Sequence, residues 1–172
     1  MGEIDFFAEE YRREPLRNDE EFGIVDGRED KPAYTIDSKD GAEAMVENPN
    51  RKDIQFTPLD RNITIYKLGT QNKESLCDGM LHSGVDYIAF VELKAVKQKW
   101  VQKATAQLEN TIDVFKRYHD IMQFSNRYAY AANRKHGYDV KSSHRELKSN
   151  FHNQTNCFLR LTNKIIVSED KE

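Results

Sequence analysis

The sequence predicts one α/β (α+β) domain in which a mixed central sheet is flanked by helices. Residues 63–68 alternate between apolar and polar side chains, as a half-buried strand does. The runs 76–81 and 87–94 are separated by a short turn and form a predicted β-hairpin. Between residues 100 and 120, apolar side chains recur every three or four positions, which predicts an amphipathic helix with Val101, Ala104, Leu108, Ile112 and Phe115 on its buried face.

The remaining elements follow from shorter patterns. Apolar residues at helical spacing predict a helix over residues 4–11, with Pro15 at or just beyond its end. Residues 18–60 are rich in charge, glycine and proline; we expect mainly loop there, with a short strand at 34–36 and a short helix at 42–46. After the long helix we expect a strand at 127–132, a short helix at 143–151, and one bent strand or two strands within 157–167.

Composition limits the class of protein. A chain of 172 residues with 38% hydrophobic and 32% charged residues is long enough for one domain with its own core. No apolar run approaches the ~20 residues of a membrane span, and the acidic start lacks the basic segment of a signal peptide, so we expect a cytoplasmic protein with no membrane partner. Cys77 and Cys157 have no zinc-ligand or disulfide-framework spacing.

The predicted hairpin brings charged side chains to the end of an apolar strand. In the second strand Glu92 and Lys94 share one face with Ile88 and Phe90, while the opposite face (Tyr87, Ala89, Val91, Leu93) is expected to be buried. If the turn is the three-residue loop 84–86, Asp78 lies directly opposite Glu92, at the ~5 Å separation at which two carboxylates can bind one cation. Such a cluster predicts metal-assisted phosphodiester hydrolysis, in which the lysine orients the attacking water or neutralises developing charge.

An aspartate, a gap of about a dozen residues and then Glu-x-Lys on a strand resembles the PD-(D/E)XK nuclease superfamily. The following helix is similar as well, because Ala104, Gln107, Leu108, Thr111 and Ile112 match the Ala-x-x-Gln-Leu-x-x-Thr-Ile pattern of many members. The residue before Asp78 is Cys77, where the name-giving motif has proline. The resemblance covers residues 63–166 and implies a restriction endonuclease-like (Holliday junction resolvase-like) fold with an αβββαβ core.

The resemblance also implies a function and a set of site residues. It implies a Mg²⁺-dependent (or Mn²⁺-dependent) phosphodiester hydrolase with Asp78, Glu92, Lys94 and Gln107 as catalytic residues. The metal ligands would be Asp78, Glu92 and the backbone carbonyl of Leu93. A further acid from an N-terminal helix often contacts the metal in this superfamily; Glu43 is the first candidate, ahead of Glu10 and Glu47.

Charge is distributed unevenly along the chain. Residues 1–93 carry a net charge of -10, residues 94–164 carry +9, and the last eight residues carry -2. A basic segment directly after the carboxylates is typical of a surface that follows a phosphate backbone, although a single lysine there could equally be a solvated surface charge. The candidate phosphate contacts are Lys97, Lys99, Lys103, Arg134 and Lys135.

Three segments are expected: an N-terminal helix with an acidic, irregular region packed on the core (1–60), the nuclease-like core (61–168) and a charged tail (169–172). We expect the first helix to be dispensable for folding. The expected partner is nucleic acid, with DNA favoured over RNA. The sequence leaves open whether the protein forms a homodimer. The alternatives are a non-catalytic protein of the same fold that binds nucleic acid or protein, and an unrelated α/β fold in which the hairpin charges form a structural ion pair.

Overall fold

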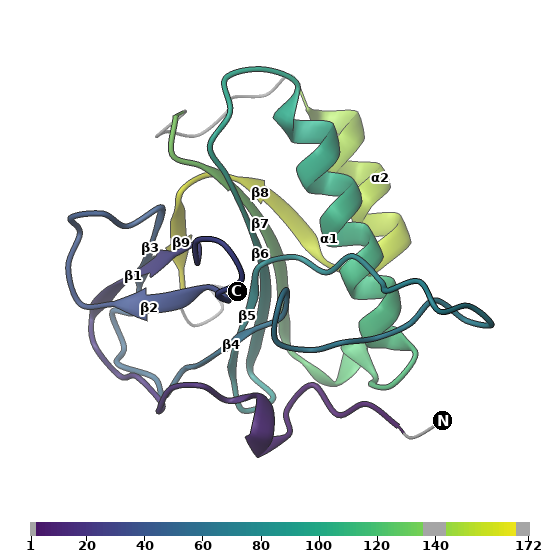
Figure 1. Ribbon diagram of the computed structural model, residues 1–172. Helices are drawn as coiled ribbons and strands as arrows, with labels where there is room; N and C mark the ends of the chain where they lie inside the picture. Colours follow the sequence, from purple (N-terminus) through teal and green to yellow (C-terminus); the bar gives the residue numbers. More distant parts are fainter. Residues whose placement is uncertain (1–2, 136–143, 168–172) are drawn as a thin grey trace.

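The computed structural model describes residues 3–135 and 144–167, and within them the chain forms two mixed β-sheets and two α-helices (Figure 1). The α+β class is therefore as expected. The larger sheet has five strands in the order β4-β5-β6-β7-β8. The first two strand pairs are antiparallel and the last two are parallel. Its strands are β4 (Gln55–Pro58), β5 (Gly79–Ser83), β6 (Tyr87–Lys94), β7 (Asn126–Asn133) and β8 (Phe158–Leu161).

Strands β5 and β6 form the hairpin predicted from the sequence. Ser83 pairs with Tyr87, so the connection is the expected three-residue loop 84–86, and Gly84 adopts a left-handed conformation there (φ 53°). At the other end of the hairpin Gly79 pairs with Val91. The next positions along the two strands are Asp78 and Glu92, which are therefore opposite one another.

Both α-helices cover one face of the central sheet (Figure 1). Helix α1 (Trp100–Lys116) buries the predicted apolar stripe, including Ala104, Leu108, Ile112 and Phe115, against Ile88 and Phe90 of β6. Helix α2 (Arg145–Thr155) lies beside it and buries Phe151 in the same core; its expected start at residue 143 falls outside the described residues.

A second sheet covers the opposite face of the central sheet. Its order is β2-β1-β3-β9, with β2 (Tyr34–Ile36), β1 (Glu21–Val25), β3 (Ala44–Glu47) and β9 (Lys164–Ile166). Phe22, Ile24 and Val46 pack there against Ala89 and Val91 of β6. Strand β6 is consequently buried on both faces, which explains why it is almost continuously apolar until Glu92.

Several predicted elements were wrong. Residues 42–46 form no helix, because residues 44–46 belong to strand β3. Ala44 and Val46, two positions apart, both point into the core between the sheets. Residues 63–68 form no strand of either sheet; Ile63 and Ile65 are buried, but Tyr66 makes only an isolated bridge to Lys73. The alternating pattern in residues 63–68 therefore reflects an irregular segment that is buried on one side. The first strand of the central sheet is β4.

The N-terminal segment also differs from the prediction. Within the described part of residues 4–11 the only helix is the single 3₁₀ turn η1 (Glu9–Tyr11), so the expected αβββαβ order lacks its first helix there. Phe6 is nevertheless fully buried against Phe115, with ring centroids 5.1 Å apart. The segment is therefore part of the core, which argues against the expectation that it is dispensable for folding.

The two sheets do not divide the chain at residue 60. Strand β4 precedes that position and belongs to the central sheet, whereas β9, near the C-terminal end, belongs to the second sheet beside β3. Residues 169–172 fall outside the described part of the chain. Neither α1 nor α2 nor any other helix in the described ranges has the length and apolar character needed to cross a bilayer.

Candidate active site

Asp78 and Glu92 form a carboxylate pair at the end of the β5–β6 hairpin. Asp78 directly precedes β5, and its Oδ2 accepts a hydrogen bond from the Leu93 N–H at 2.7 Å. Glu92 lies on β6 and is only 5% exposed. The strand register therefore places the two carboxylates as the sequence predicted, and the apolar strands around them exclude most of the water that would screen their charges.

The surroundings oppose the simultaneous ionisation of both acids. Burial, followed by the negative charge of Glu92, raises the pKa of Asp78 to about 9. Burial also raises the pKa of Glu92, while the ammonium group of Lys94 lowers it. Lys94 Nζ lies 2.9 Å from Glu92 Oε2. Lys94 thus offsets the charge of Glu92, and an additional cation would relieve the repulsion between the two acids.

The oxygen atoms around this pair fit a magnesium ion. In a β-strand the N–H and C=O of one residue point to the same side, so the Leu93 carbonyl faces the side on which its N–H meets Asp78. Among the described residues no group of three or more His, Cys, Asp or Glu side chains is arranged to hold a metal ion. Mg²⁺ commonly binds through one or two carboxylates and keeps several waters, so two carboxylates and one carbonyl are a suitable set.

Gln107 lies on α1 and holds the segment that leads into Asp78. Its Nε2 donates to the Leu76 carbonyl at 2.7 Å, and Asn110 Nδ2 donates to the Ser75 carbonyl at 2.8 Å. One turn further along, Thr111 Oγ1 accepts the Cys77 N–H at 2.7 Å. These contacts fix residues 75–77 against the helix. Gln107 is therefore placed to position Asp78 through the backbone; its predicted catalytic role stays a prediction.

Two acids that the sequence analysis did not select lie close to the pair. Asp26, directly after β1, is among the charges that raise the pKa of Asp78, and burial raises its own pKa while Arg61 lowers it. Asp60, just beyond β4, raises the pKa of Glu92, and its N–H donates to the Cys77 carbonyl at 3.1 Å. Asp60 could have been found from the sequence, because it directly follows an apolar segment. Asp26 could not, because it follows strand β1, which the sequence did not predict.

Glu43, the predicted additional metal ligand, is engaged elsewhere. Its Oε2 accepts the Asp26 N–H at 2.6 Å, and its Oε1 lies 3.5 Å from Arg134 Nη1. Glu43 thus holds Asp26 next to the pair. The two other candidates are Glu47, which forms an ion pair with Lys164 at 3.2 Å, and Glu10, which lies in η1.

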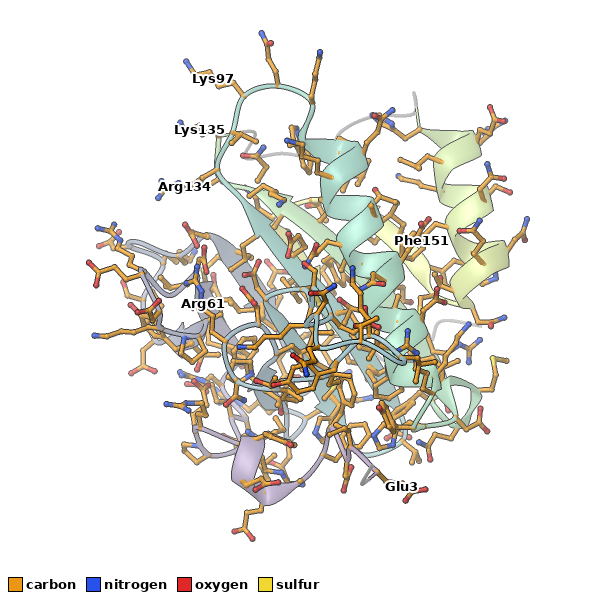
Figure 2. The ribbon with its side chains drawn as sticks, turned by 45° about the vertical axis from the view of Figure 1, so that its right-hand side comes forward. Glu3, Arg61, Lys97, Arg134, Lys135 and Phe151 are labelled. Carbon is orange, nitrogen blue, oxygen red and sulfur yellow. The ribbon has the colours of Figure 1, made fainter. Side chains whose placement is uncertain are left out.

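The predicted phosphate contacts gather near the carboxyl ends of β6 and β7. The Arg134 N–H donates to the Lys94 carbonyl at 3.1 Å, so Arg134 and Lys135 follow directly beside Lys94. Lys97 and Lys99 lie in the β6–α1 loop, and Lys103 lies in the first turn of α1. Lys97, Lys135 and Arg134 lie along one side of the molecule in Figure 2. The buried Asn133 connects the end of β7 to the β6–α1 loop, because its Nδ2 donates to the Val96 carbonyl at 2.6 Å.

Comparison with protein-family models, with curated proteins and with solved structures gave no match to this chain.

Proposed function

We propose that this protein is a divalent-metal-dependent nuclease that hydrolyses phosphodiester bonds of DNA. The observation that supports this proposal best is the convergence of Asp78, Glu92 and Lys94 at the end of one hairpin, with Glu92 buried and Asp78 half-buried. Burying two like charges beside apolar strands destabilises a protein unless the charges have a task or a counter-ion. The resemblance to the PD-(D/E)XK nucleases gives the same residues that task.

Each residue has a role in the proposed reaction. Asp78, Glu92 and the Leu93 carbonyl would hold the ion, which would polarise the scissile phosphate and acidify a bound water. Lys94 contacts Glu92 at 2.9 Å, so its ammonium group stays beside the carboxylates, where it can orient the attacking water or offset charge that develops on the phosphate. Gln107 and Thr111 keep Asp78 in register by fixing residues 76 and 77.

The basic residues support nucleic acid as the substrate. Arg134 and Lys135 directly follow the strand beside Lys94, and both are exposed. Lys97, Lys99 and Lys103 extend the same charge toward α1. Lys and Arg neutralise backbone phosphates whatever the base sequence, so this edge favours general affinity for nucleic acid.

Cleavage assays with supercoiled plasmid, single-stranded DNA and a short RNA test the proposal. We expect cleavage with Mg²⁺ or Mn²⁺ and none with EDTA. Asp78→Asn and Glu92→Gln keep the size of each side chain and should abolish cleavage. Asp86→Asn is the matched control, because this acid lies in the exposed hairpin loop, and it should behave as wild type.

The assays also separate the proposal from its alternative. Binding of nucleic acid without cleavage under all metal conditions would favour a non-catalytic member of the same fold. Cleavage that survives in both Asp78→Asn and Glu92→Gln would contradict the assigned site.

A further inference from the structure

We infer that the second sheet carries a pocket for an unpaired nucleobase of the substrate, next to the carboxylate pair; this inference rests on the proposed nuclease function. The pocket has a volume of about 600 Å³ and lies at the end of strands β1 and β2. Asp26 is one of its lining residues. Arg61 binds the carbonyl of the next residue, Gly27, and the N–H of Asp60, which precedes Arg61, donates to the carbonyl of Cys77, directly before Asp78, so the pocket adjoins the proposed site.

The walls of the pocket suit a flat aromatic ligand. Val25 of β1 pairs with Tyr34 of β2, so both side chains point to the same outer face of the second sheet, together with Ile36. Tyr34 is 47% exposed, so its ring is accessible to a ligand. An aromatic ring beside aliphatic side chains offers a stacking surface, and stacking on aromatic side chains is the usual way in which proteins hold unpaired bases.

The charges at the rim of the pocket favour a nucleobase over a phosphate as the ligand. The rim combines two cations, Arg28 and Lys31, with two carboxylates, Asp26 and Asp40. A phosphate site would favour cations alone, whereas a nucleobase presents both hydrogen-bond donors and acceptors along its edge. The Watson–Crick edge is free only in a single strand or in a nucleotide extruded from a duplex. The pocket therefore points to single-stranded or locally opened DNA as the substrate.

The loop that forms the rim is held in place before any ligand binds. Arg61 Nη1 donates to the carbonyls of Gly27 and Lys31 at 3.1 and 3.2 Å, and the Asp26 N–H is bound by Glu43. Gly27 has no space for a side chain, since a Cβ there would lie 2.0 Å from the Lys31 carbonyl oxygen. Arg61 directly follows Asp60, so the same short segment connects the rim to the carboxylate pair. A rigid rim lowers the entropic cost of ordering a ligand.

Fluorescence titration with DNA that contains 2-aminopurine tests this pocket. The protein carries Lys94→Ala to prevent cleavage, and binding is measured in EDTA to a single strand and to a blunt duplex. We expect tighter binding to the single strand, with quenching of the probe. Tyr34→Ala should weaken single-strand binding at least fivefold and relieve the quenching, whereas Tyr34→Phe should keep both because the ring remains.

Tyr66→Ala is the matched control, because Tyr66 is 49% exposed but lies away from the pocket, near its bridge to Lys73. Equal affinity and equal quenching in the Tyr34→Ala and Tyr66→Ala proteins would overturn the inference. The cleavage assay on the protein with an intact Lys94 is read separately. If the protein cleaves DNA but Tyr34→Ala changes neither affinity nor quenching, the pocket is wrong and the nuclease function stands. If Tyr34→Ala weakens binding but the protein cleaves no DNA, the nuclease function is wrong and the pocket stands.

Discussion

The Asp78 carboxylate accepts a 2.7 Å hydrogen bond from the backbone N–H of Leu93, across the open end of the β5–β6 hairpin. This bond favours the ionised acid, but burial and the charge of Glu92 outweigh it and raise the pKa of Asp78. The bond therefore orients the carboxylate without making it stable as an anion. A cation bound at the proposed site would relieve the same burial and repulsion that destabilise the metal-free protein.

The first prediction concerns stability and pH. The pKa of Asp78 is about 9 in the folded protein and ~3.9 in an unfolded chain, so between these values the folded state binds more protons. Without metal, stability should fall as pH rises through this window. We expect Asp78→Asn, which can still accept the Leu93 N–H, to raise stability at pH 8 by several kcal/mol, since each pKa unit corresponds to about 1.4 kcal/mol.

Thermal denaturation of EDTA-treated protein between pH 7 and 9 checks this expectation. Burial lowers the pKa of His82 to about 4, so His82 changes stability only at lower pH and does not disturb this range. Mn²⁺ should stabilise the wild-type protein at pH 8 and leave Asp78→Asn unaffected. A wild-type melting temperature that is flat across this range, with and without Mn²⁺, would contradict both the burial argument and the metal site.

The second prediction separates chemistry from binding at Lys94. Lys94→Ala removes the ammonium group next to Glu92, so we expect single-turnover cleavage to slow by about 100-fold or more, a typical size for one general catalytic group. Affinity for DNA should stay within about threefold, because one phosphate contact is a small part of the total. Single-turnover kinetics and gel shifts measure the two effects. Weak binding with an intact rate would make Lys94 a binding residue.

The hairpin could be predicted from the sequence because its signals are local. The loop 84–86 sets the register, and the alternation in β6 then decides that Glu92 faces Asp78. The apolar stripe of α1 is local as well, since it repeats every three or four residues. The hairpin and α1 were both predicted, and so was the pair of acids that the hairpin carries.

The second sheet could be predicted only in part: β2 and β9 fall where strands were expected, whereas β1 was expected to be loop and β3 a helix. Strand β3 has four residues and pairs in parallel with β9, more than 100 residues later in the chain. A run such as 42–46 also fits one turn of a helix, and only the long-range partner decides between the two. Asp26 and the Glu43–Arg134 contact were missed for this reason, since each depends on where that sheet packs.

The third prediction tests Gln107 as a positioning residue. Gln107→Glu keeps the length of the side chain but replaces the donor to the Leu76 carbonyl by an acceptor. We expect a lower cleavage rate and weaker Mn²⁺ binding, because the segment before Asp78 is no longer fixed. Asn110→Ala removes the neighbouring bond to Ser75 and should have a smaller effect, since it acts one residue further from Asp78. Wild-type metal affinity in Gln107→Glu would argue against this role.

The fourth prediction concerns the basic edge. The logarithm of DNA affinity should fall linearly with the logarithm of salt concentration, by ~0.9 per phosphate contacted on a duplex and ~0.7 on a single strand. Single alanine substitutions of Lys97, Lys99, Lys103, Arg134 and Lys135 should each reduce this slope by about one where the residue is a contact. Lys39→Ala, on the acidic side and paired with Glu21, is the control and should not change it. An affinity independent of salt would favour a protein partner.

The fifth prediction concerns the N-terminal segment. Phe6 is fully buried against Phe115, and its N–H donates to His119 Nε2 at 3.0 Å, so the segment completes the core beneath α1. Phe6→Ala should lower the free energy of unfolding by roughly 3–4 kcal/mol, the usual cost of emptying a buried phenylalanine site. Phe158→Ala is the control: that ring is 45% exposed, so the loss should be about 1 kcal/mol or less. Urea denaturation followed by circular dichroism measures both, and equal losses would place the first residues outside the folded core.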